Sequence, residues 1–267
     1  MRVTVAWPMY AVDPRAVEVF WQGLRSHMIA AGVESVPDSL EWPQEFYEHW
    51  LSPTLLLSQT CGYPLTTGLA GRVNYLCTPR FRAAGCEGAS YSSAVVIRED
   101  DPALSIVDCA GRRVAFNSSD SQSGYNALRA LVAPHAKNGR FFSDSIETGA
   151  HRLSLRAIKA GQADVAAIDA ITFALLSKGK PEEVEGLRIL GYTDKAPGLP
   201  LITSLRTPPS DVARLRRALD EACADPELAQ CCAALLLEGF ELLPPAAYDA
   251  IGAMRNRAIG LAYPELA

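Results

Sequence analysis

The sequence predicts an α/β protein with two lobes. Short apolar runs alternate with helical patterns over most of the chain, and this alternation is typical of parallel sheets built from βαβ units. The Gly-rich "GCEGASYSS" (85–93) and the Pro-rich "KAPGLPLITSLRTPP" (195–209) mark the two places where the chain would cross between lobes. With 267 residues, of which 49% are hydrophobic, the chain is long enough to form two cores.

The expected elements follow from the period of the apolar residues. We expect strands at Val3–Ala6, Leu55–Ser58, Val73–Cys77, Ser93–Arg98, Arg113–Asn117, Phe141–Glu147, Ala163–Ile168 and Leu187–Gly191. We expect helices at Asp13–Ala31, Gln44–His49, Ser123–Ala133, Ala150–Ala160 and Ala170–Ser177. From Ser210 onward the pattern is almost purely helical.

These elements define the expected lobes. Lobe 1 would contain residues 1–92 and 192–267, with the C-terminal helical segment packed on it, and lobe 2 would contain residues 93–191. Ligands of open α/β sheets bind beyond the carboxyl ends of the strands. We therefore expect the loops after the strands to line a ligand cleft between the lobes.

Composition excludes several classes of function. The formal net charge is -5 and no basic run occurs, which argues against nucleic-acid binding. No apolar stretch approaches the ~20 residues that cross a bilayer, so direct membrane insertion is not expected. The seven cysteines include no C-x-x-C pair, which argues against a zinc site and a disulfide framework. We expect neither a metal nor a cofactor.

The start of the chain bears on location. "MRVTVAWPMY" leads directly into a β-prone run without the charged leader and apolar segment of a secretory signal. Together with the seven cysteines, this predicts a cytoplasmic protein. If a leader is removed from the native chain, a periplasmic location is expected instead.

The stretch "SDSQSG" precedes a predicted helix and carries more small polar side chains than one N-cap requires. A helix N-terminus binds anions because its N–H groups lack partners and its dipole is positive there. Ser121 and Ser123 would add hydroxyl donors, Gln122 an amide donor, and Gly124 would let the backbone approach the ligand closely. The alternative is a polar loop with an ordinary cap.

Other polar or aromatic residues follow strands or lie near the crossing segment. His151 would donate to a bound anion when protonated, or serve as a general base. Asp169 would contact the ligand or cap the next helix. The remaining candidates for ligand contact are Gln59, Thr60 and three tyrosines, Tyr10, Tyr63 and Tyr91, for which burial in a core is the alternative.

Four segments resemble successive blocks of the phosphate-, phosphite- and phosphonate-binding proteins of ABC importers, which have the type II periplasmic binding fold. They are "YSSAVVIREDDP", "GRRVAFNSSDSQSGYNALRALV", "TGAHRLSLRAIKAGQADVAAID" and "APGLPLITS", within about residues 55–205. The resemblance implies that Ser121, Gln122 and Ser123 donate to phosphonate oxygens, that His151 joins them, and that Tyr91 walls the cleft. It also implies an ABC transporter permease as partner.

The sequence departs from that family in two ways. Gln122 stands where the family usually has Thr, and the places where some members carry acids for an aminoalkyl tail fall near Ile171 and Ile202. An ammonium-bearing ligand is therefore not favoured.

Three functions are considered. The favoured hypothesis is a solute-binding protein for a small oxyanion that closes its lobes on the ligand. The alternative is a cytosolic enzyme that resembles the same fold, a lyase of the chorismate dehydratase or thiamine-pyrimidine synthase type that uses His151. A degenerate receptor domain that binds another protein is the third.

Overall fold

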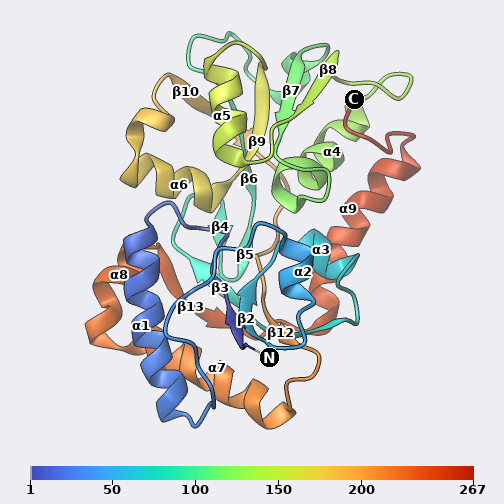
Figure 1. Ribbon diagram of the computed structural model, residues 1–267. Helices are drawn as coiled ribbons and strands as arrows, with labels where there is room; N and C mark the ends of the chain where they lie inside the picture. The colour runs from blue at the N-terminus through green and yellow to red at the C-terminus, as the bar shows by residue number, and fades with distance from the viewer. Residues whose placement is uncertain (1) are drawn as a thin grey trace. The chain divides into compact units, whose positions relative to one another are not determined.

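The computed structural model describes residues 2–267 and divides the chain into two compact units (Figure 1). Unit 1 consists of the chain up to Arg82 together with Glu87–Ala89 and Gly198–Pro245. Unit 2 consists of Ala83–Cys86, Ser90–Pro197 and Ala246–Ala267. Each unit is built on its own five-stranded sheet, so the predicted α/β class with two lobes is confirmed.

The sheet of unit 1 has the strand order β1-β2-β12-β3-β13. Its strands are β1 (Thr4–Val5), β2 (Leu55–Gln59), β12 (Leu201–Ser204), β3 (Val73–Phe81) and β13 (Leu237–Glu241). Strands β1 and β2 are parallel, whereas β12 and β13 pair antiparallel with their neighbours. The helices of this unit are α1 (Pro14–Ala30), α2 (Phe46–Trp50), α3 (Gly62–Thr66), α7 (Pro209–Ala224) and α8 (Ala229–Ala234).

Helix α1 illustrates how the sequence sets these elements. The Asp13 carboxylate accepts hydrogen bonds from the backbone N–H groups of Arg15 and Ala16, at 3.0 and 3.1 Å, and so caps the helix. One face of α1 is fully buried, including Trp21 and Leu24, and the helix contacts α7 and α8. Burial of this apolar face is the main favourable contribution of α1 to the fold.

The sheet of unit 2 has the order β10-β6-β9-β7-β8. Its strands are β10 (Leu187–Tyr192), β6 (Ser93–Arg98), β9 (Val165–Asp169), β7 (Arg113–Phe116) and β8 (Asp144–Glu147). Strand β7 is parallel to β8 and β9, whereas β6 is antiparallel to β9 and β10. The helices are α4 (Ala127–Val132), α5 (His151–Lys159), α6 (Ala170–Gly179) and α9 (Asp249–Gly260).

Several short elements complete the fold. A small sheet has the order β11-β5-β4, formed by Ala196–Pro197, Ser90–Tyr91 and Cys86–Glu87. Short 3-10 turns lie at Ile106–Cys109, Ala133–His135, Pro181–Glu183, Pro226–Leu228 and Pro245–Tyr248.

The sheets are mixed, and this differs from the expected parallel sheets. Strand β12 lies in the Pro-rich segment 195–209, which was expected to cross between the lobes. Strand β13 interrupts the region after Ser210, which was expected to be helical. Both are short and are flanked by prolines or contain glycine, so their apolar period is too brief to identify from sequence. Their antiparallel pairing to β3 converts a parallel arrangement into a mixed one.

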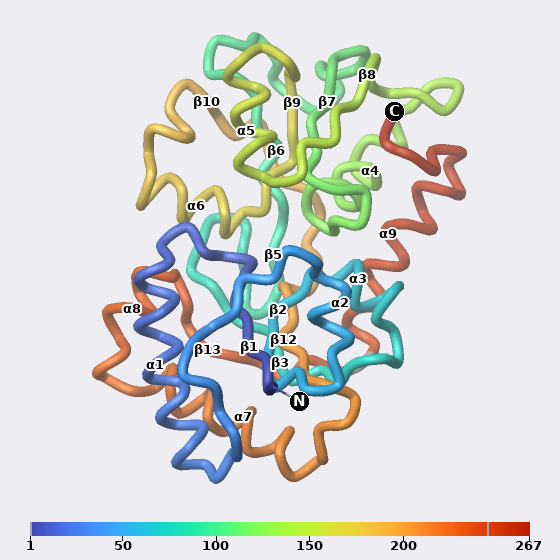
Figure 2. Tube along the Cα trace, in the orientation of Figure 1, coloured from blue at the N-terminus to red at the C-terminus, as the bar shows by residue number. Residues whose placement is uncertain are grey.

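The C-terminal segment also differs from expectation. Helices α7 and α8 belong to unit 1, but the chain crosses again after Pro245 and residues 246–267 belong to unit 2. Figure 2 shows this red part of the trace beside α4, which α9 contacts. Tyr263 and Leu266 are buried in the unit 2 core, and the Ala267 carbonyl accepts from the Phe141 and Phe142 N–H groups. An apolar helix pattern shows that a face is buried but not which core covers it.

We expect Leu266→Ala to destabilise unit 2 by about 2–5 kcal/mol, because the substitution leaves a cavity in a packed core. Leu266 is 3% exposed. The matched control is Leu261→Ala, since Leu261 is 47% exposed and belongs to the same segment; its effect should stay within about 0.5 kcal/mol. Urea unfolding followed by fluorescence and circular dichroism measures both. Equal effects of the two substitutions would contradict the burial described here.

Candidate functional site

The segment after β7 forms a π-turn and not the ordinary α-helical start that the sequence predicted. Residues Gln122–Asn126 are π-helical, and Asn126 N donates to the Ser121 carbonyl, five residues earlier, at 3.0 Å. Helix α4 then continues from Ala127. π-turns within helices are rare and occur frequently at functional sites. The stretch selected from sequence therefore has an unusual backbone.

Ser121 caps this turn. Its Oγ accepts a hydrogen bond from the Gly124 N–H at 3.1 Å, as the ordinary-cap alternative predicted. A serine hydroxyl that accepts one hydrogen bond still carries its own O–H donor. The capping role and a role in anion binding are therefore compatible.

Gly124 is needed because two side chains approach its backbone. A Cβ atom there would lie 1.9 Å from Asn117 Oδ1 and 3.2 Å from His151 Cε1. Asn117 Oδ1 is buried and has no hydrogen-bond partner. The sequence predicted a close approach at Gly124 and attributed it to a ligand, whereas in this structure side chains of unit 2 make the approach.

Ser123 and His151 form a hydrogen-bonded pair. Ser123 Oγ lies 2.9 Å from His151 Nε2, and the Ser123 carbonyl accepts a hydrogen bond from Ser93 Oγ at 2.9 Å. His151 is the first residue of α5, so the turn after β7 and the turn after β8 bring the pair together. The two residues were separate candidates in the sequence, and the structure places them in contact.

The electrostatic environment keeps the His151 imidazole neutral. Burial lowers the pKa of His151 from 6.5 to about 4, and an interaction with the Ala167 backbone opposes part of this shift. Part of the residue reaches the surface, but Nδ1 is buried and has no hydrogen-bond partner. The ring therefore lies in a poorly solvated environment that penalises its charged form.

Gln122 turns toward α9. Its Nε2 lies 3.2 Å from the Met254 sulfur, and its Oε1 accepts from Asn126 Nδ2 at 2.7 Å. Asn126 Nδ2 also donates to the Ile251 carbonyl at 3.1 Å, and Asn126 Oδ1 accepts from Arg129 at 2.7 Å. All three polar residues are buried. This network fixes the π-turn to α9.

Sequence reasoning did not single out Asn126. Asparagine is unfavourable within a helix because its amide competes for backbone hydrogen bonds. An asparagine four residues after Gln122, in an otherwise apolar helix pattern, is the signal that would have indicated this buried network.

Asp169 acts as the cap of α6. Its Oδ1 accepts from the N–H groups of Ile171 and Thr172 at 2.9 and 3.0 Å, which is the capping role that the sequence predicted as one alternative. Tyr91 is buried, and its strand β5 pairs with β11. Ligand contact by either residue stays a prediction.

The four candidates of unit 1 have different surroundings. Tyr10 is 3% exposed and packs edge-on against Phe81, with ring centroids 5.0 Å apart, which fits a core residue. Gln59 is fully buried at the end of β2; its Nε2 donates to the Leu199 carbonyl at 3.4 Å, and its Oε1 has no hydrogen-bond partner. Thr60 is buried, and Tyr63 is half-buried in α3.

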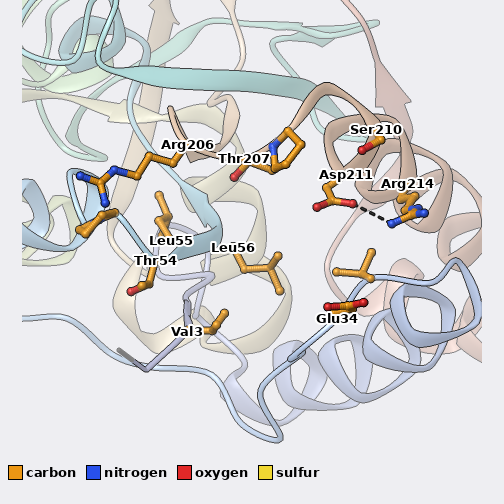
Figure 3. Close-up of a pocket in the computed structure, with 13 residues that line it drawn as sticks. Val3, Glu34, Thr54, Leu55, Leu56, Arg206, Thr207, Ser210, Asp211 and Arg214 are labelled. Atoms are coloured by element: carbon orange, nitrogen blue, oxygen red, sulfur yellow. Dashed lines mark hydrogen bonds and ion pairs between the residues drawn. The ribbon is translucent and has the colours of Figure 1, made fainter.

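A pocket of about 370 Å³ in unit 1 contains none of the predicted site residues. It lies beside the start of α7, between the loop after α1 and the start of β2. Figure 3 shows the ion pair between Asp211 and Arg214, at 2.9 Å, on its wall. The lining also includes Arg206 and Glu34, so two arginines are balanced by two carboxylates and the pocket has no excess of positive charge for an anion.

Within residues 2–267, no group of three or more His, Cys, Asp or Glu side chains is arranged to hold a metal ion. Over the same residues, no helix has the length and apolar character needed to cross a bilayer.

Known structures resemble this fold closely. A binding-protein component of an ABC phosphonate transporter from Pseudomonas aeruginosa superposes with a TM-score of 0.78 at 15% identity, covering 97% of this chain and 87% of that one. PhnD1 from Prochlorococcus marinus, solved with methylphosphonate, gives 0.76 at 11% identity over 96% and 98%. A Xanthomonas citri protein solved with ATP gives 0.70 at 15% identity over 98% of both chains.

These likenesses define a type II periplasmic binding fold. Residues 69–248 match the family described as "ABC transporter, phosphonate, periplasmic substrate-binding protein". Because the match covers more than half of the chain, the protein belongs to this family, and its role is to bind a solute. No curated protein sequence matches the chain. The family match favours the binding protein over the enzyme alternative.

The low pKa of His151 predicts a pH dependence of stability. The unfolded chain takes up a proton near pH 6.5, whereas the folded site resists protonation until about pH 4. The folded protein therefore has its full stability above pH 6.5. As the pH falls toward 4, its free energy of unfolding decreases by up to about 3 kcal/mol. We expect His151→Gln to lose less stability than the parent over this range in urea unfolding.

The control for this measurement is His135→Gln, since His135 is an exposed histidine of the same unit. It should follow the parent at each pH. A His151→Gln profile parallel to the parent would contradict the neutral, desolvated imidazole described above.

Proposed function

We propose that the protein binds a small tetrahedral oxyanion, a phosphate, a phosphonate or a relative, through Ser121, Ser123 and His151. The observation that carries this proposal is the contact between Ser123 and His151 at the capped π-turn that Ser121 begins. The family assignment supports the ligand class. Two hydroxyls, backbone N–H groups and an imidazole then face the same ligand.

The Ser123–His151 pair has two neutral proton arrangements. In one, the Ser123 hydroxyl donates to Nε2 and presents only lone pairs to a ligand. In the other, Nε2–H donates to Ser123 Oγ, and the Ser123 hydroxyl is free to donate onward. An anion selects the second arrangement, because only that one presents a donor. The imidazole then strengthens the serine as a donor, since hydrogen bonds in a chain polarise one another.

The absence of a fixed positive charge among these three residues makes release feasible. Neutral donors hold a dianion less strongly than arginine or lysine would. A bound anion close to His151 would raise its pKa, because a nearby negative charge favours the imidazolium. We exclude Gln122 from the proposed donors, because its amide is directed at Met254.

The remaining candidates are supported to different degrees. Roles for Tyr10, Thr60, Tyr63 and Tyr91 as ligand contacts stay predictions. A role for Gln59 also stays a prediction, because its unpartnered Oε1 is a hydrogen-bond acceptor and its amide nitrogen donates to the Leu199 carbonyl. We do not assign one to Asp169, since its carboxylate is committed to the α6 cap and would repel an anion.

The family also implies a partner and a location. An ABC transporter permease is the proposed partner, because the family supplies solutes to such transporters. The family description favours the periplasmic alternative of the sequence-based prediction over the cytoplasmic one. This location is tested by fractionating cells that express the native gene. A periplasmic protein should be detected in the periplasmic extract.

The binding site is tested by titration calorimetry and thermal shift with phosphate, phosphite, methylphosphonate, sulfate and chorismate. We expect at least one tetrahedral anion to stabilise the parent protein. The Ser121→Ala/Ser123→Ala variant should bind that anion at least about tenfold more weakly, since each lost hydrogen bond to a charged group costs about 1.5–3 kcal/mol.

Ser105→Ala is the matched control, because Ser105 caps the 3-10 turn Ile106–Cys109 of the same unit and is no proposed ligand. It should bind the anion like the parent. Undiminished binding by the double variant would place the site elsewhere. Stabilisation by chorismate alone would favour the enzyme alternative.

A further inference from the structure

Another pocket of unit 1, of about 430 Å³, differs in charge from the pocket in Figure 3. The described residues that line it include two arginines, Arg72 and Arg206, and no Asp or Glu. The lining comes from the segments that precede β2 and β3 and from the end of β12. Gln59 and Thr60 follow the opposite end of β2 and do not line this pocket. Its volume is typical of small-molecule sites, which span about 300–1,000 Å³.

Neither arginine has an acidic partner within residues 2–267. Arg72 Nη1 donates to the Gly68 carbonyl, with 3.2 Å between the nitrogen and the oxygen, and a carbonyl leaves the guanidinium charge unbalanced. The Arg206 side chain makes no hydrogen bond or ion pair with the described residues. A guanidinium carries five N–H donors. Most of the donors of both arginines are therefore available to a ligand.

Hydrogen bonds fix the backbone at Arg206. Its N–H donates to Ser204 Oγ at 3.2 Å, and the Ser204 hydroxyl donates to the Pro53 carbonyl at 3.1 Å. These bonds join the end of β12 to the segment before β2, and both segments line the pocket. Arg206 also lines the pocket in Figure 3, but its guanidinium is directed away from Asp211 and Glu34. The Arg206 guanidinium is thus not paired with either carboxylate.

The pocket also has an apolar wall. Trp50 is 3% exposed and packs with Leu55 and Ile202 in a core cluster of unit 1. Leu51 is partly buried against that cluster, whereas Leu205 is 55% exposed. An exposed leucine in a pocket with two arginines offers apolar surface that a ligand would remove from water. Positive charge and apolar surface therefore occur together in this pocket.

We propose that this pocket binds a small organic anion, a carboxylate or a phosphate ester that carries an apolar group. Arg72 and Arg206 donate to the anionic oxygens, because the planar guanidinium matches the geometry of carboxylate and phosphate groups. The apolar group contacts Leu51 and Leu205. The residues of this pocket belong to unit 1, whereas those of the proposed oxyanion site belong to unit 2.

The test is a titration of the ¹⁵N-labelled full-length protein, followed through the amide resonances of Leu51, Ser52 and Leu205. Phenyl phosphate and benzoate are the probes. We expect at least one of them to shift these resonances in a saturable way below roughly 10 mM, because a ligand of this size makes few contacts. Phenol, which is uncharged, should bind at least about tenfold more weakly. The absence of a saturable shift with both probes, or equal binding of phenol, would overturn the proposal.

Arginine variants test the donors. We expect Arg72→Met and Arg206→Met each to weaken binding of the probe about five- to tenfold, since each removes guanidinium donors and one positive charge. Arg82→Met is the matched control, because Arg82 is exposed in the same unit, pairs with Glu238 and does not line the pocket. It should keep the parent affinity. The proposal is wrong if all three variants lose affinity equally, or if both pocket variants bind like the parent.

Leu205→Ser tests the apolar wall. We expect it to weaken binding of the probe about threefold or more, because the aromatic ring of the probe loses apolar contact. Leu242→Ser is the matched control, since Leu242 is 58% exposed in unit 1 and does not line the pocket. It should bind the probe like the parent. Parental affinity in Leu205→Ser would overturn the assigned contact with the apolar group.

Discussion

Burial of polar groups is the constraint on which the arrangement of the candidate site depends. A buried donor or acceptor without a partner costs about 1–3 kcal/mol, so the polar turn after β7 has to find its hydrogen bonds within unit 2. Asn126 provides three of them: two from its amide to Gln122 and Ile251, and one at its oxygen from Arg129. These bonds hold the π-turn in one conformation. The fixed turn in turn holds the hydroxyls of Ser121 and Ser123 in place.

The same constraint explains why the His151 imidazole is neutral. Its ring is desolvated and its first contact is a hydroxyl, which supplies no charge to balance an imidazolium. Such a site is preorganised but carries little net charge. The anion of the proposed function would bring the missing charge and would meet donors already in place. In the proposed site, the hydrogen-bonding geometry is therefore set by the protein, and the ligand would complete the electrostatic balance.

The sequence predicted the α/β class and most strands, because these follow from the local apolar period. It also selected Ser123 and His151, which lie in contact, and Ser121, which caps the π-turn. It did not predict where α9 packs, because amphipathicity is the same whichever core covers the helix. It did not predict β12 or β13, whose pairing with β3 is long-range. The π-turn was also missed, since an insertion of one residue into a helix is stabilised by tertiary contacts such as those of Asn126.

Gln122 shows how a departure from the family pattern acquires a physical meaning. The resemblance implies a short Thr at this position, with a hydroxyl that reaches the ligand. The longer glutamine side chain extends to Met254 of α9 and to Asn126. Threonine is too short to make both contacts. At position 122 this chain therefore has a side chain that attaches the turn to α9, in place of the hydroxyl that the resemblance implies as a ligand donor. The position of α9 in unit 2 and the identity of residue 122 are therefore linked. In the proposed site, the donors are correspondingly the two serines, the backbone and His151.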